Sequence, residues 1–137
     1  MSPSKPEQLA REQIDAALSG AGWVVQDRDD LNLTAGRGVA VREFVMASGH
    51  GFADYLLFVD GHAVGALEAK PAGHTLSGVE GQASKYSLGL PVDLDAPLRP
   101  LPFLYLSTGV ETQFVNGLDR DARSRRGILK LSNSLTT

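Results

Sequence analysis

Two acidic residues and a lysine have the types and the spacing of a reaction centre: Asp54, Glu68 and Lys70. Glu68 and Lys70 lie two apart in an apolar stretch that reads as a strand, so both side chains point to the same face. Two carboxylates about one cross-strand distance apart can share a hard cation such as Mg²⁺, and a nearby lysine can orient an attacking water or stabilise developing negative charge. The trio indicates metal-assisted phosphodiester hydrolysis. From spacing alone, an exposed acid beside an ordinary Glu–Lys pair stays open as the alternative.

The position of Asp54 relative to Glu68 depends on the hairpin turn between their strands, at the Asp60-Gly61 dipeptide. A strict two-residue loop pairs Asp54 with Leu67, so that Asp54 faces away from Glu68. A three-residue loop with Gly61 in the left-handed conformation, or a bulge with the same effect, puts both acids on one face. We therefore predict one of these two arrangements, because a strict two-residue loop would exclude the site.

A helix is expected to open the chain. Ser4 can cap its start, and a glycine pair at 20 and 22 ends it. Its apolar stripe is expected to comprise Leu9, Ile14, Ala17 and Leu18. Residues 23–25 are read as a short extended piece, and 27–38 as a loop.

The remaining pattern predicts strands separated by a second helix. The 52–59 strand is almost continuously apolar, which is typical of a central strand covered on both faces. The order predicts an α/β fold with a mixed central sheet flanked by helices. The expected strands are 39–46, 52–59, 63–70, 103–107 and 113–115, and the second helix is 77–88.

Composition places the chain among globular proteins. Its 137 residues are 42% hydrophobic and 21% charged, which suits a single domain with its own core. It has no cysteine, so disulfides, iron–sulfur clusters and cysteine-based zinc sites are excluded. No apolar run approaches the roughly 18 residues of a membrane span, and no secretory signal is recognisable. We expect a cytoplasmic protein with no membrane partner.

The charge balance leaves nucleic-acid binding open. The formal net charge is −3 at pH 7, but the acidic metal ligands of a nuclease would cancel basic residues in such a total. Basic residues gather between Arg120 and Lys130. This run could contact phosphates or could be an ordinary solvated segment, and the sequence does not decide between the two.

Several segments together resemble the N-terminal nuclease domain of the restriction (R) subunit of type I restriction enzymes. They are REF at 42–44, GFADYLLF at 51–58, GALEAK at 65–70, QASKY at 82–86, PFLYLSTG at 102–109 and RSRR at 123–126. The resemblance covers about residues 11–128. It implies the PD-(D/E)xK nuclease superfamily and its restriction-endonuclease-like αβββαβ core. We expect one nuclease-like domain over 1–137, with the core at about 7–128 and a flexible tail at 129–137.

The resemblance also implies roles for individual residues. Asp54 and Glu68 match the two metal-binding acids of the family, and Lys70 matches the lysine of its ExK motif. Gln82 and Tyr86 match its QxxxY motif. They lie four apart on the predicted helix, where they could contact the DNA backbone or orient Lys70, although Tyr86 could also be half-buried core. Alanine precedes Asp54 where the superfamily name has proline, a departure that is typical of the restriction-subunit family.

Other polar residues are weaker candidates. Glu12 on the first helix is a possible additional acid, although an exposed helix acid is the simpler reading. Glu43 is either a paired edge acid, which we favour, or a third metal contact. The histidines at 50, 62 and 74 lack metal-ligand spacing, and we expect all three to be exposed.

The resemblance implies a metal-dependent DNA endonuclease domain with little sequence specificity, using Mg²⁺ with Mn²⁺ as a substitute. Expected partners are DNA and possibly other restriction-modification subunits or a separate translocase. The sequence has no Gly-x-x-x-x-Gly-Lys-[Ser/Thr] phosphate loop, so ATP hydrolysis by that route is not expected from it. The alternatives are a DNA- or partner-binding module that keeps the nuclease fold without cutting alone, and a homologue that acts on RNA or modified DNA.

Overall fold

A computed structural model describes residues 5–71, 89–99, 101–116 and 125–126. One α-helix, α1 (Lys5–Gly20), and one short 3₁₀ helix, η1 (Arg28–Asp30), lie within these ranges. No helix among the described residues is long and apolar enough to span a membrane. The predicted second helix at 77–88 and the Ser4 cap lie outside the described residues.

Helix α1 buries one narrow stripe. Ala10, Ile14 and Leu18 are buried at intervals of four residues, which is the spacing of one helical face. The expected stripe was partly wrong, because Leu9 and Ala17 are exposed. After the helix, Gly22 has a φ of 103°, and the Trp23 N–H donates to the Leu18 carbonyl oxygen at 3.0 Å. This left-handed turn ends the helix and leads the chain into the sheet.

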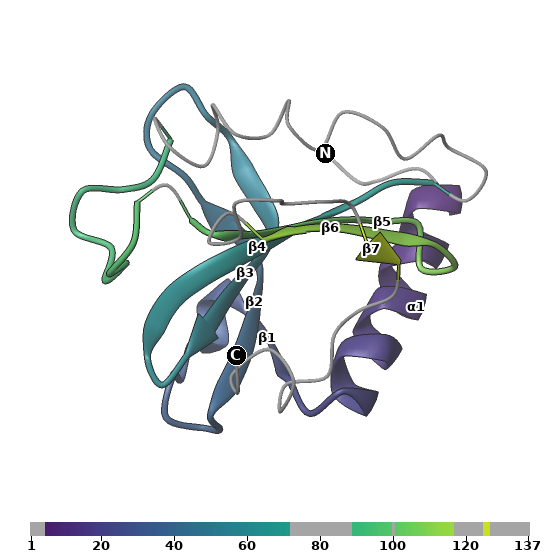
Figure 1. Cartoon of the computed structure of the whole chain (residues 1–137), viewed down its shortest axis with the longest axis horizontal. Coiled ribbons are helices and arrows are strands. Elements are labelled where there is room, and N and C mark those ends of the chain that lie inside the picture. The colour runs from purple at the N-terminus through teal and green to yellow at the C-terminus, as the bar shows by residue number, and fades with distance from the viewer. Residues whose placement is uncertain (1–4, 72–88, 100, 117–124, 127–137) are drawn as a thin grey trace.

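The strands form one seven-stranded mixed sheet in sequential order (Figure 1). Neighbours β1–β2 and β4–β5 are parallel and the other pairs are antiparallel. The prediction of a mixed α/β fold is confirmed, whereas the αβββαβ core stays a prediction. The strands are β1 (Val24–Asp27), β2 (Gly38–Val45), β3 (Phe52–Val59), β4 (His62–Ala69), β5 (Phe103–Ser107), β6 (Thr112–Asn116) and β7 (Arg125–Arg126).

The core has two layers, one on each face of the sheet. Strand β3 supplies residues to both, as its continuous apolar run predicted: Tyr55 and Leu57 to one, Leu56 and Phe58 to the other. The first layer includes Ile14 and Leu18 of α1. Burial on both faces makes β3 a central strand and fixes its register, because a slip by one residue would exchange the two sets of side chains.

The β3–β4 hairpin contains the predicted register shift. Asp60 and Gly61 have φ values of 51° and 85°, as in a two-residue type I′ turn. Val59 pairs with His62, but Leu57 pairs with Gly65, so β4 has a bulge next to the turn. The bulge, and not a three-residue loop, produces the predicted alignment. The ladder ends at the pair Tyr55–Leu67; continued by one residue, its register would pair Asp54 with Glu68.

Candidate active site

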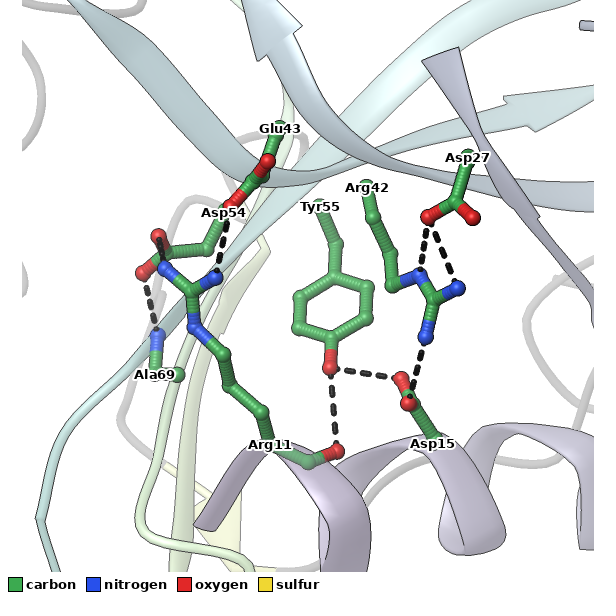
Figure 2. Close-up of polar contacts among 8 residues, drawn as sticks. All are labelled: Arg11, Asp15, Asp27, Arg42, Glu43, Asp54, Tyr55 and Ala69. Carbon is green, nitrogen blue, oxygen red and sulfur yellow. Dashed lines mark hydrogen bonds and ion pairs between the residues drawn. The ribbon is translucent and has the colours of Figure 1, made fainter. Parts of the chain in front are cut away.

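Asp54 follows the last ladder pair of β3 and β4, Tyr55–Leu67, and Figure 2 shows its carboxylate between Arg11 and Ala69. Its Oδ2 accepts a hydrogen bond from the Ala69 backbone N–H at 2.8 Å. At this point the acceptor is therefore a side chain of β3 and not its backbone. Its Oδ1 accepts a hydrogen bond from Arg11 Nη2 at 2.6 Å. Only 19% of the Asp54 side chain is exposed. Both oxygens of the first predicted metal ligand are therefore engaged, one by a guanidinium group.

Arg11 reaches this point from helix α1 and also contacts strand β2. Its Nη1 lies 3.1 Å from Glu43 Oε1, so the guanidinium connects two carboxylates. Burial alone would lower the pKa of Arg11, but the charges of Asp54 and Glu43 outweigh it and the pKa is raised. Arg11 is therefore fully charged, and it already supplies a cation at the carboxylate of Asp54.

Glu43 reaches Arg11 through an irregular backbone. Its φ of 53° is left-handed, a conformation that costs a non-glycine residue about 1–3 kcal/mol. The β2–β3 ladder is interrupted at Glu43 and Asp54, between the pairs Arg42–Tyr55 and Phe44–Ala53. The sheet thus loses its regular pairing at the point where these two carboxylates meet Arg11.

Glu68 and Lys70 lie at the end of β4. Glu68 is buried, between Leu67 and Ala69, which both belong to the layer that packs on α1. Lys70 is half-buried, and its backbone N–H donates to the Ser107 carbonyl oxygen at 2.7 Å, which extends the contact with β5. The structure thus brings Asp54 to the same end of the hairpin as Glu68 and Lys70. A metal shared by Asp54 and Glu68 stays a prediction.

The donor set can be tested against Mg²⁺. The predicted ligands offer only carboxylate oxygens, which suit this hard ion, and Asp54 already has a cationic partner in Arg11. Within the described ranges, no group of three or more His, Asp or Glu residues could hold a metal. The carboxylate oxygens of Asp54 and Glu68 have the chemistry that would hold Mg²⁺, with Arg11 as the competing cation at Asp54.

A second arginine network lies beside the first. Arg42 on β2 contacts Asp15 of α1 at 2.8 Å and Asp27 of β1 at 2.7 Å. The buried Tyr55 hydroxyl lies 2.7 Å from Asp15 Oδ1 and 3.1 Å from the Arg11 carbonyl oxygen. Burial raises the pKa of Tyr55 strongly, and its hydrogen bond to the Asp15 carboxylate raises it further.

A polar pocket of about 330 Å³ separates helix α1 from β1 and β2. Both additional acids proposed from the sequence line it, Glu12 from the helix and Glu43 from the strand. The pocket also connects the two arginine networks, because residues of each contribute to its wall. Its lining consists of Gln8, Arg11, Glu12, Asp15, Asp27, Arg42 and Glu43.

Sequence reasoning missed Arg11, Asp15 and Arg42. The i, i+4 spacing of Arg11 and Asp15 on α1 was a usable signal, since it puts both on one helical face. Arg42 gave no local signal, because its partners are 15 and 27 residues away.

The remaining candidates lie away from Asp54 or outside the described residues. His62 is exposed, as predicted, and lies 3.0 Å from Asp95. His50 is half-buried in the loop before β3, so the expectation of full exposure was wrong for it. Gln82, Tyr86 and His74 lie outside the described residues, as does most of the basic run.

Comparison with known proteins identifies the family. A family model described as the second domain of the type I restriction enzyme EcoKI endonuclease subunit matches residues 28–99, more than half of the chain. The match includes Glu43, Asp54, Glu68 and Lys70, and α1 with Arg11 precedes it. No match was found among curated proteins or among solved structures. The chain therefore belongs to the family of the second domain of the type I restriction enzyme EcoKI endonuclease subunit.

Proposed function

We propose that the chain is a metal-dependent DNA endonuclease domain of the PD-(D/E)xK type, with little sequence specificity of its own. The observation that supports this most is the bulge in the β3–β4 hairpin, because its register, continued one residue beyond Tyr55–Leu67, would pair Asp54 with Glu68. Membership in a type I restriction enzyme family adds a DNA-directed context. DNA and other restriction-modification subunits, or a separate translocase, are the partners that we propose.

In this proposal the residues have separate tasks. Asp54 and Glu68 hold Mg²⁺, and Lys70 orients the attacking water or stabilises charge on the phosphate. When bound, Mg²⁺ supplies a coordinated water of lowered pKa and neutralises phosphodiester charge. Gln82 and Tyr86 contact the DNA backbone. The reaction forms a bond between water oxygen and phosphorus and breaks one phosphorus–oxygen ester bond.

A second candidate function is a DNA- or partner-binding module that keeps the fold without cutting alone. The observation that favours it is that both oxygens of Asp54 already accept hydrogen bonds, one from Arg11 and one from the Ala69 N–H. A binding module would not need Arg11 to release the Asp54 carboxylate. Cleavage that appears only with partner subunits would leave the endonuclease proposal intact. If the chain together with all its partner subunits does not cleave DNA, the binding module is favoured.

The test of the endonuclease proposal is Mg²⁺-dependent cleavage of plasmid DNA, by the chain alone and together with its partner subunits. Lys70→Ala should abolish cleavage while circular dichroism and the unfolding midpoint stay unchanged. Lys5→Ala removes an exposed lysine at the start of α1 and should cut like the wild type. If Lys70→Ala cuts as fast as Lys5→Ala, with contaminating nuclease excluded, the assignment of Lys70 is wrong.

A further inference from the structure

Arg11 and a metal ion at Asp54 would compete for the same oxygen. Arg11 Nη2 lies 2.6 Å from Asp54 Oδ1, and these side chains are 22% and 19% exposed. Two cations within a few ångströms repel each other, and limited exposure reduces the screening by water. The remaining oxygen, Oδ2, accepts the Ala69 N–H. A divalent cation would therefore bind Asp54 more strongly once the guanidinium moves away.

The same pocket offers Arg11 other acidic side chains. Its Nη1 already contacts Glu43, and Glu12 and Gln8 line the pocket as well. Arg11 Nε is buried without a hydrogen-bond partner among the described residues, so the carboxylates hold only the Nη ends of the group. A rotation toward Glu43 and Glu12 would keep the guanidinium paired with acids while it exposes Asp54 Oδ1.

We propose that Arg11 is a positioning residue that occupies Asp54 in the metal-free protein, so that its release sets the affinity for the divalent cation. This inference rests on the proposed metal site of Asp54 and Glu68. Arg11 holds the Asp54 carboxylate in place when no metal is bound. The cation affinity of the chain is consequently weaker than two carboxylates would give without Arg11.

Arg42 provides a matched control for this inference. It is also an arginine in the polar pocket, and it also lies between two carboxylates, Asp15 and Asp27. Neither of these acids is a proposed metal ligand. Replacing Arg42 therefore changes the net charge by the same amount as replacing Arg11, but leaves the contacts of Asp54 unchanged.

The experiment is a Mn²⁺ titration of isotope-labelled protein, with amide broadening in NMR spectra followed residue by residue. We expect Arg11→Gln to bind Mn²⁺ near Asp54 about 5- to 150-fold more tightly than the wild type, the usual range of coupling between linked equilibria. Arg42→Gln should stay within about twofold of the wild type, as expected for a site that shares no partner. Equal or weaker binding by Arg11→Gln would overturn the inference.

A second measurement uses the unmodified chain, in case Arg11→Gln does not fold. Mg²⁺ is added to the wild type and the guanidinium signals of both arginines are followed. We expect the Arg11 signals to shift with Mg²⁺ binding while the Arg42 signals stay in place. If Mg²⁺ binds and the Arg11 signals do not move, the inference is wrong.

The outcomes also separate this inference from the proposed function. If Mn²⁺ broadening near Asp54 occurs in the wild type, is lost in Asp54→Asn and is unaffected by Arg11→Gln, only the role of Arg11 fails. If neither the wild type nor Arg11→Gln shows localised broadening at Asp54 and Glu68, the proposed metal site fails, and the role of Arg11 with it.

Discussion

Arg11 and Arg42 make similar ion pairs in different surroundings. Each connects helix α1 with the sheet and lies between two carboxylates, and in each case burial tends to lower the arginine pKa while the acids raise it. Arg42 joins Asp15, whose other oxygen contacts the buried Tyr55 hydroxyl. Arg11 contacts Asp54, whose other oxygen accepts the Ala69 N–H just beyond the last pair of the β3–β4 ladder.

The difference separates a structural network from a candidate functional one. The Arg42 network ends on a tyrosine that is packed in the core, so the contact between Asp15 and Tyr55 ties it to the fold. The Arg11 network ends where the strands separate, beside Glu68 and Lys70. Nearly identical ion pairs can therefore have different roles, and the groups next to the carboxylates decide which role each pair has.

The largest expected effect comes from removing the central acid of the Arg11 network. Asp54→Ala should lower the free energy of unfolding by about 2–3 kcal/mol, because it removes the acceptor of Arg11 Nη2 and of the Ala69 N–H and leaves Arg11 only Glu43. Urea denaturation measures this loss. Asp54→Asn keeps an acceptor and should lose less. A cost below about 0.5 kcal/mol for Asp54→Ala, the size of an exposed-surface effect, would contradict this reading.

A smaller effect is expected in the Arg42 network. Tyr55→Phe should cost about 1 kcal/mol at neutral pH, because it removes one buried hydrogen bond to a carboxylate that keeps Arg42 as a partner. Urea denaturation again measures the change. A loss as large as that of Asp54→Ala would mean that the two networks contribute to folding in the same way.

The same substitution has a pH-dependent signature. Because the folded state raises the pKa of Tyr55, the folded chain keeps a proton that the unfolded chain loses above about pH 10. Wild-type stability should therefore fall as the pH rises above that value. The stability of Tyr55→Phe should fall less over the same pH range. Part of the fall that remains comes from Tyr105, whose pKa burial raises to about 12. Identical alkaline slopes in both proteins would refute the assignment to Tyr55.

The smallest effects are expected at the outer acid of each network. Glu43 and Asp27 are 62% and 58% exposed, and exposed ion pairs contribute about 0–1 kcal/mol with screening by salt. Glu43→Gln and Asp27→Asn should each change stability by less than about 0.5 kcal/mol, and less still in high salt. Thermal unfolding at two salt concentrations measures both. A large loss at only one of them would show that the networks differ at their outer acids as well.

Much of the fold was predictable because its signals are local. The continuous apolar run of β3 predicted burial on both faces, and glycines predicted the end of α1 and the turn at Gly61. The need to align Asp54 with Glu68 predicted a loop or bulge that shifts the register, and the bulge is present. Leu9 was misplaced because the buried stripe of α1 is narrower than its apolar pattern.

The sequence by itself determined strands β2 to β6, the central place of β3, and the hairpin that brings Asp54 to the same end as Glu68 and Lys70. Periodicity and turn chemistry act over a few residues, so they can be read along the chain. Only the tertiary structure decided that Arg11 occupies Asp54, since 43 residues separate the two. That contact depends on where α1 docks and on the irregular backbone at Glu43, and both result from packing across the whole sheet.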